Sequence, residues 1–220
     1  MKKSSKNRLT PQQQALFPGD TLFDKVARAV CRAGTLPRKE LYEAWEMAKR
    51  VRRRYRGGRV VDLACGHGLL AHLLLILDDS SECALAVDSN LPLNAGKLSS
   101  ELIASWPRLA GRIIFKPVAL EEIIILPDDI VVSAHACGLL TDLIIERAVA
   151  KRARVAVLPC CHDLKQSSTG GLDGWMDKTL AVDVVRALAL QGKGYRIVTQ
   201  EIPGDITPKN RLLMGDYRPG

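Results

Sequence analysis

The sequence lacks a long apolar run. Its longest, Leu69–Leu77, is interrupted by His72 and falls far short of the roughly 20 residues that a membrane-spanning helix needs. The basic start at Met1–Lys6 continues into polar residues rather than into an apolar stretch, so we expect no secretory signal. These absences predict a soluble chain with no membrane partner, and no pattern in the sequence predicts an obligate protein partner.

Closely spaced cysteine pairs are also missing. The six cysteines include no CxxC pair, the spacing that many zinc sites and redox motifs use. In the absence of an export signal, free thiols indicate a reducing compartment, and we expect the protein to be cytoplasmic. The remaining composition, with 47% hydrophobic and 25% charged residues, is ordinary for a globular domain.

Positive charge is concentrated in the first part of the chain. Residues 1–59 carry 16 Lys and Arg against 5 Asp and Glu, whereas residues 60–220 carry 16 against 19. Apolar residues at three- and four-residue spacing predict a helix from Lys39 to the Gly57–Gly58 pair, and seven cations crowd its end at Lys49–Arg59. We therefore predict a basic helical extension over residues 1–59, a second domain over residues 60–220, and a nucleic-acid partner for the cations. The open alternative is a helix whose charges only keep it soluble.

Short apolar segments alternate with helical segments beyond Gly58. This alternation favours a parallel sheet with helices on both faces. The last two segments are joined by a turn at Pro203–Asp205 that leaves no room for a crossover helix, so they should pair antiparallel. The predicted fold class is α/β, a Rossmann-like, mostly parallel sheet of seven strands with an antiparallel terminal hairpin. The expected strands are Val60–Leu63, Ala84–Val87, Ile113–Phe115, Ile130–Ser133, Val155–Leu158, Tyr195–Glu201 and Arg211–Met214.

The loop after the first expected strand has the features of a nucleoside-binding turn. Asp62 precedes it, and Gly66 and Gly68 can bend sharply and let the backbone approach a ligand. Asp88 ends the second strand, 22 residues after Gly66, where an acid can accept hydrogen bonds from ribose hydroxyls. Ala71 replaces the third glycine of a dinucleotide-binding GxGxxG loop, which favours S-adenosylmethionine over NAD.

Reactive side chains follow the fourth and fifth expected strands, at the edge of the sheet where ligands bind. The segments read HxCG and then TD from His135, and PCCH from Pro159, and a TPxN motif begins at Thr207. With the Asp62–Gly68 loop, these motifs make the sequence resemble the methyltransferase domain shared by the eukaryotic tRNA ribose 2′-O-methyltransferases of the acceptor stem and by the glutathione S-transferase C-terminal domain-containing proteins. The resemblance spans roughly residues 60–215. It implies a class I methyltransferase that uses S-adenosylmethionine and acts on RNA.

The same segments supply the candidate catalytic residues. A hydroxyl acceptor needs a base, and His135 or His162 titrates near neutrality, although each could instead only hydrogen-bond a loop carbonyl. Cys160 and Cys161 are candidate nucleophiles or packing thiols. With Cys137 and His135 they offer ligand types that suit zinc, but adjacent cysteines lack the usual spacer, so we predict no metal site. The predicted cofactor-binding residues are Asp62, Ala64, Cys65, Gly66, His67, Gly68, Asp88, Ser89, Ser133 and His135.

The function that we predict is S-adenosylmethionine-dependent methylation of RNA, either tRNA or rRNA, with the substrate phosphates held by Lys49–Arg59. One alternative is a methyltransferase of small molecules or proteins, whose substrate binding would be insensitive to salt. Another is a catalytically silent nucleic-acid-binding module with the same fold, which would not bind the cofactor.

Overall fold

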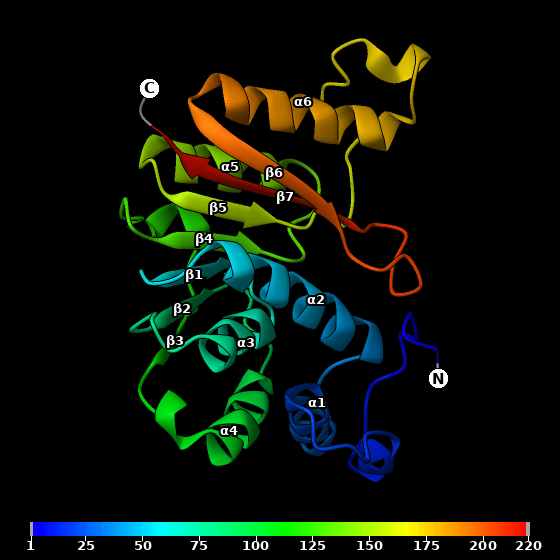
Figure 1. The fold of residues 1–220 in the computed structure, drawn as a ribbon, viewed down its shortest axis with the longest axis vertical. Coiled ribbons are helices and arrows are strands. Elements are labelled where there is room, and N and C mark those ends of the chain that lie inside the picture. The colour runs from blue at the N-terminus through cyan, green and yellow to red at the C-terminus, as the bar shows by residue number, and fades with distance from the viewer. Residues whose placement is uncertain (1, 219–220) are drawn as a thin grey trace.

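Seven strands form one mixed sheet in the computed structural model, which describes residues 2–218 (Figure 1). They are β1 (Val60–Leu63), β2 (Ala84–Val87), β3 (Ile113–Lys116), β4 (Ile130–Ser133), β5 (Arg154–Val157), β6 (Tyr195–Glu201) and β7 (Arg211–Tyr217). Their order is β3-β2-β1-β4-β5-β7-β6. The first five run parallel, and β7 pairs antiparallel with β5 and β6. This topology confirms the predicted fold class.

Four strand ends differ from the apolar pattern of the sequence. β3 extends by one residue to Lys116, β5 begins one residue earlier at Arg154 and ends one residue earlier at Val157, and β7 continues to Tyr217. β7 stays paired with β6 over its full length. Asp216 interrupts the apolar pattern there, but the strand tolerates it because its carboxylate contacts three guanidinium groups, those of Arg54, Arg196 and Arg218.

Helices cover both faces of the sheet. One face carries α1 (Leu22–Ala33), α2 (Arg38–Arg54), α3 (Leu69–Leu77) and α4 (Ala95–Ser105), and the other carries α5 (Leu139–Ala150) and α6 (Lys178–Gly192). Successive strand residues point to opposite faces, so Val60 belongs to the apolar cluster under the first four helices and Val61 to the cluster under the other two. Short 3₁₀ helices lie at Pro11–Leu16, Pro107–Leu109, Leu120–Glu122 and Leu172–Gly174. No helix within residues 2–218 is long and apolar enough to cross a membrane.

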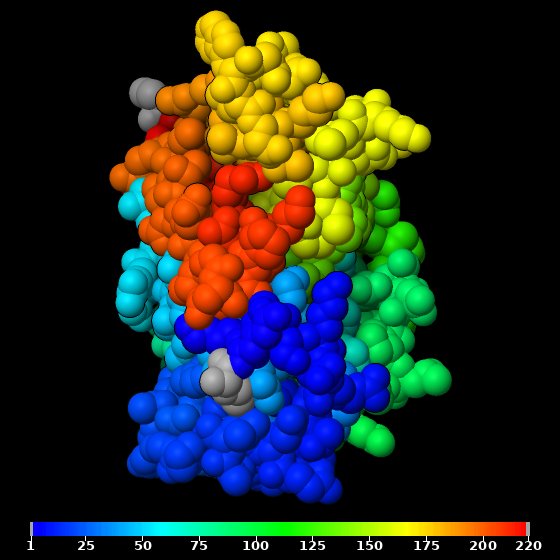
Figure 2. Space-filling view, turned by 90° about the vertical axis from the view of Figure 1, so that its right-hand side faces the viewer, coloured from blue at the N-terminus to red at the C-terminus, as the bar shows by residue number. Residues whose placement is uncertain are grey.

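The N-terminal residues share one core with the sheet. Val26 of α1 and Met47 of α2 are fully buried in the same apolar cluster as Leu73 of α3. Figure 2 shows the first residues, in dark blue, against the orange-red loop between β6 and β7, where Lys3 Nζ lies 2.8 Å from Asp205 Oδ2. The predicted boundary between two parts of the chain after residue 59 stays a prediction. The predicted parts, residues 1–59 and 60–220, include Met1 and residues 219–220, which lie outside the described residues.

The cation-rich segment Lys49–Arg59 is largely engaged in ion pairs. Six of its seven cationic side chains lie within ion-pair distance of a carboxylate. Arg52 is 3% exposed, and it donates hydrogen bonds to Leu74 O and to Ser81 Oγ, each at 2.8 Å. Its Nη1 also lies 3.4 Å from Asp78 Oδ2. The segment therefore fastens the end of α2 to α3 and to the amino edge of the sheet.

We expect Arg52→Ala to lower the free energy of unfolding by about 3 kcal/mol or more, because buried acceptors lose their donor and Asp78 loses a cation. Arg53→Ala removes an exposed cation one residue further along α2 and should change that free energy by less than about 0.5 kcal/mol. Urea unfolding of both variants measures the difference. Similar losses in the two would contradict the role given to Arg52.

Candidate active site

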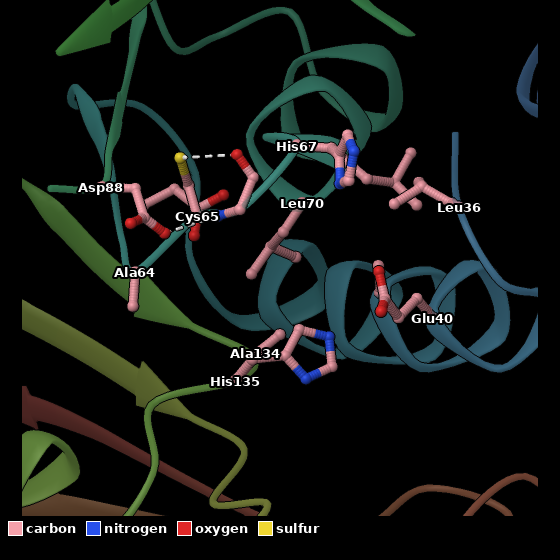
Figure 3. Close-up of a pocket in the computed structure, with 13 residues that line it drawn as sticks. Leu36, Glu40, Ala64, Cys65, His67, Leu70, Asp88, Ala134 and His135 are labelled. Atoms are coloured by element: carbon pink, nitrogen blue, oxygen red, sulfur yellow. Dashed lines mark hydrogen bonds between the residues drawn. The ribbon is translucent and has the colours of Figure 1, made fainter. Parts of the chain in front are cut away.

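The loop between β1 and α3 lies against the end of β2. Asp88, the first residue after β2, accepts a hydrogen bond from Gly66 N–H at 3.0 Å and another from Asn90 N–H at 2.9 Å. The N–H of Cys65 donates to Val87 O at 3.0 Å. The predicted glycine turn and the predicted acid are therefore in direct contact, as Figure 3 shows.

Two glycines shape this loop for different reasons. Gly66 and Gly68 have φ angles of +53° and +73°, in the left-handed region that costs other residues roughly 1–2 kcal/mol. A Cβ on Gly68 would also lie 2.9 Å from the Phe115 ring, whereas a Cβ on Gly66 would meet nothing within 4 Å. Gly68 thus allows close packing on β3, and Gly66 leaves open space for a ligand. Ala64 adopts a φ of +56° despite its Cβ, a strained conformation of the kind found at functional sites.

Asp62 lies beneath the loop and is 2% exposed. Its Oδ2 accepts a hydrogen bond from the N–H of Ala71, in the first turn of α3, at 3.1 Å. Burial raises the pKa of Asp62 to about 8; the bond from Ala71 opposes this rise and the carboxylate of Asp88 adds to it. A carboxyl group with such a pKa is mostly neutral at pH 7 unless a cation approaches it.

A pocket of about 280 Å³ opens beside the loop. One wall is the loop itself, and the opposite wall comes from Leu36, before α2, and from Glu40 and Ala44 on α2 (Figure 3). His135, after β4, lies at the lower side of this view. No pattern in the sequence predicts the wall formed by α2. The spacing of apolar residues shows which face of a helix is buried, but it does not show which loop that helix faces.

The charge of this pocket is negative. The carboxylates of Glu40 and Asp88 line it together with the Asp62 carboxyl, which ionises when a cation approaches, and among the described residues that line it there is no Lys or Arg. Such a lining attracts a cation and repels a pyrophosphate, which needs positive charge or free N–H groups around it. The pocket therefore fits a cationic ligand better than one that carries a pyrophosphate.

A second hollow of about 210 Å³ lies on the other side of Asp88. It shares Ala64 and Asp88 with the first pocket, so the carboxylate of Asp88 stands between the two. Leu120 and Leu140 make part of its lining apolar, and Glu121 adds a carboxylate. These residues follow β3 and β4 at positions that no motif marks, so the sequence does not predict their place in a pocket.

The ten predicted cofactor-binding residues occupy four places. Ser89 lines the second hollow. Gly68 packs on Phe115 beneath the loop, and Ser133 is buried at the end of β4, with no hydrogen-bond partner for its Oγ among residues 2–218. The other seven line the first pocket: Asp62, Ala64, Cys65, Gly66, His67, Asp88 and His135. Their contacts with a cofactor stay predictions.

The four predicted catalytic residues do not share one cavity. His135 lines the first pocket, whereas Cys161 and His162 line a separate hollow of about 440 Å³. The side chain of His162 is 1% exposed, and its Nε2 lies 2.7 Å from Asp183 Oδ1. Burial raises the pKa of the Cys160 thiol far above its usual range, which disfavours the thiolate that a nucleophile needs. The catalytic roles stay predictions, and the geometry favours His135 among the four.

The motif residues after β4 and β5 join one network of ion pairs. Arg186 of α6 donates to both carboxylate oxygens of Asp142, each at 2.7 Å. Arg211 donates to Asp183 Oδ2 at 2.7 Å. Although burial alone would raise the pKa of Asp183, hydrogen bonds from His162 and Arg211 hold it below its usual range. The network fixes the two loops to α6 and to β7.

Comparison with known proteins identifies the domain. A sequence family described as a methyltransferase domain matches residues 39–167. The human glutathione S-transferase C-terminal domain-containing protein is 32% identical over 199 aligned residues, which cover 72% of this chain and 30% of that protein. The chain thus spans about a third or less of the length of the curated relatives that it matches.

Two solved structures share the fold. An O-methyltransferase family protein from Burkholderia thailandensis has a TM-score of 0.53 and 18% identity, covering 98% of this chain and 66% of that one. The ribosomal protein L11 methylase from Lactobacillus delbrueckii subsp. bulgaricus has a TM-score of 0.52 and 15% identity, covering 80% and 77%. At these identities the likeness establishes the fold alone.

The buried carboxyl of Asp62 generates a pH dependence of stability. The pKa of Asp62 is raised to about 8 in the folded protein, whereas in the unfolded chain an aspartate loses its proton near pH 4. As the pH rises from about 4 to about 8, the unfolded state is therefore favoured and the contribution of Asp62 to stability falls. We expect Asp62→Asn to lose less unfolding free energy between pH 5 and pH 8 than the parent does. Urea unfolding at the two pH values measures this, with Asp20→Asn, at an 88% exposed side chain, as the control. Parallel losses in all three proteins would contradict the raised pKa.

Proposed function

The chain belongs to the family of this methyltransferase domain, and we propose that it transfers the methyl group of S-adenosylmethionine to RNA. Membership of the family implies use of S-adenosylmethionine. The observation that carries the proposal for this chain is the contact between Asp88 and the loop at Gly66, beside a pocket lined by carboxyl groups.

The charge of the pocket supports this cofactor. S-adenosylmethionine carries a sulfonium and an ammonium group, and when bound it supplies an electrophilic methyl group. Glu40 and Asp62 are the carboxyl groups suited to these cations. Asp88, between the two hollows, is suited to the ribose hydroxyls. The hollow that Leu120 and Leu140 line then accommodates the adenine ring.

His135 is the residue that we propose as the general base. It lines the cofactor pocket at the carboxyl edge of the sheet, where an acceptor hydroxyl can approach it. A neutral imidazole at this place could take the proton of that hydroxyl and so prepare the oxygen to accept a methyl group. The walls of the pocket hold the two reactants in line, and positioning of this kind supplies much of the rate in bimolecular transfers.

The support for an RNA substrate is the distribution of positive charge. Around Asp216 the guanidinium groups of Arg54, Arg196 and Arg218 outnumber the single carboxylate, and the side chain of Arg56 is 66% exposed. These cations lie at the amino edge of the sheet. At 1.5 Å per residue, α2 separates Arg54 from the pocket wall at Glu40 by about 20 Å. A substrate that contacts both must be a polymer rather than a mononucleotide.

The test of this function is transfer of a radiolabelled methyl group from S-adenosylmethionine to separate pools of tRNA, rRNA and protein. We expect label in one of the RNA pools, and substrate binding that weakens steeply as salt rises, because each neutralised phosphate releases counterions. Label in the protein pool, with salt-insensitive binding, would favour the alternative of a protein methyltransferase. Failure to bind the cofactor in calorimetry would favour a silent binding module and contradict the proposal.

The Asp88 carboxylate provides a test of the cofactor site itself. We expect Asp88→Ala to weaken binding of S-adenosylmethionine by more than about 1 kcal/mol, because a charge-assisted hydrogen bond to the ribose and the anchor of Gly66 are lost together. Titration calorimetry measures the change. Asp128→Ala, at an exposed position at the amino edge just before β4, is the matched control. Unchanged affinity in Asp88→Ala would place the ribose elsewhere.

A further inference from the structure

Three cysteine sulfurs gather at the carboxyl edge of the sheet. The Sγ atoms of Cys137, Cys160 and Cys161 all lie within 4.8 Å of one another, and those of Cys137 and Cys160 are 3.1 Å apart. They come from the loops after β4 and β5, which are joined by a hydrogen bond from Gly138 N–H to Cys161 O at 2.9 Å. The sequence offers these thiols as ligand types that suit zinc, but it lacks pairs spaced by two residues, and for that reason it predicted no metal site. The fold brings the three sulfurs together.

We propose that Cys137, Cys160 and Cys161 bind one Zn²⁺ ion. Zinc binds thiolate sulfur at about 2.3 Å in tetrahedral sites, so sulfurs that share an ion lie roughly 3.8 Å apart. The observed separations, from 3.1 Å to at most 4.8 Å, bracket that value. Coordination by three thiols releases three protons and leaves the site with one net negative charge. Cys137 and Cys161 are exposed, so water completes the fourth position of the ion.

The surroundings of the cluster suit an anionic site. α5 begins at Leu139, two residues after Cys137, and the N-terminal end of a helix stabilises negative charge. Arg186 adds a cation nearby, since its Nη2 donates to Gly138 O at 3.1 Å. The ion pair between Arg186 and Asp142 and the contact between His162 and Asp183 fix the two loops that carry the sulfurs. Such an outer shell holds ligands in place for a metal.

A metal explains the cluster better than a disulfide or a nucleophile does. A disulfide would join two of the sulfurs at about 2.05 Å and leave the third without a role. A nucleophile has to reach the methyl donor, but none of the three cysteines lines the first pocket. A bound dication allows all three to ionise together.

The experiment uses the full chain, stripped of metal with EDTA and kept reduced with a phosphine. Titration with Zn²⁺ against a chromophoric chelator gives the stoichiometry and affinity, and Co²⁺ gives a thiolate charge-transfer band. We expect one ion per chain and a higher melting temperature in the presence of zinc. Cys161→Ser, at an exposed side chain, leaves the fold intact and should weaken zinc binding at least ~10-fold. Cys137→Ser and Cys160→Ser should behave alike.

Cys83→Ser is the control, because Cys83 lies before β2 at the opposite edge of the sheet. We expect it to bind zinc as the parent does. The proposal is overturned if the reduced parent takes up no zinc, or if all three cluster variants retain the parent affinity. It is also overturned if a disulfide between Cys137 and Cys160 forms under air as fast with Zn²⁺ as without it, since bound thiolates should be protected.

Discussion

The hydrogen bond from Gly66 N–H to the carboxylate of Asp88, at 3.0 Å, is the contact on which the rest of the site depends. It joins the loop after β1 to the end of β2 and places an acid between two adjoining hollows. Asp62 supports the same loop from below through the N–H of Ala71. The candidate cofactor site is therefore built on the strands of the sheet, and its two hollows are already present without a ligand.

The two edges of the sheet carry different kinds of side chain. At the amino edge, arginines such as Arg52 and Arg59 pair with buried carboxylates and fasten α2 to the sheet. At the carboxyl edge, carboxyl groups, imidazoles and thiols surround open space. The parallel strands explain this separation, because every crossover returns the chain to the amino edge and leaves the loops at the carboxyl edge free to carry reactive groups. α2 connects the two edges of the sheet, since it extends from Glu40 in the pocket wall to Arg54, which pairs with Asp216 at the amino edge.

Some of the motif residues after β4 and β5 hold their loops in place and do not face the candidate pocket. Asp142 and His162 are engaged with Arg186 and Asp183 in the network behind the loops, and they hold His135 and the cysteines at the edge of the sheet. A histidine in a motif is therefore weak support for a base. Access to the pocket, which His135 has and the buried ring of His162 lacks, distinguishes the two.

The sequence alone is enough to predict the sheet and the proximity of the glycine loop to Asp88. Both follow from local signals, namely apolar periods, glycine positions and the length of one strand–helix–strand unit. Three other features became visible only in the three-dimensional fold: α2 supplies Glu40 to the pocket, most arginines of Lys49–Arg59 are paired, and three sulfurs meet across two loops. These features depend on contacts between segments far apart in the chain. The spacing of apolar residues and glycines indicates which face of a segment is buried and where the chain turns. It does not indicate which distant segment packs against that face.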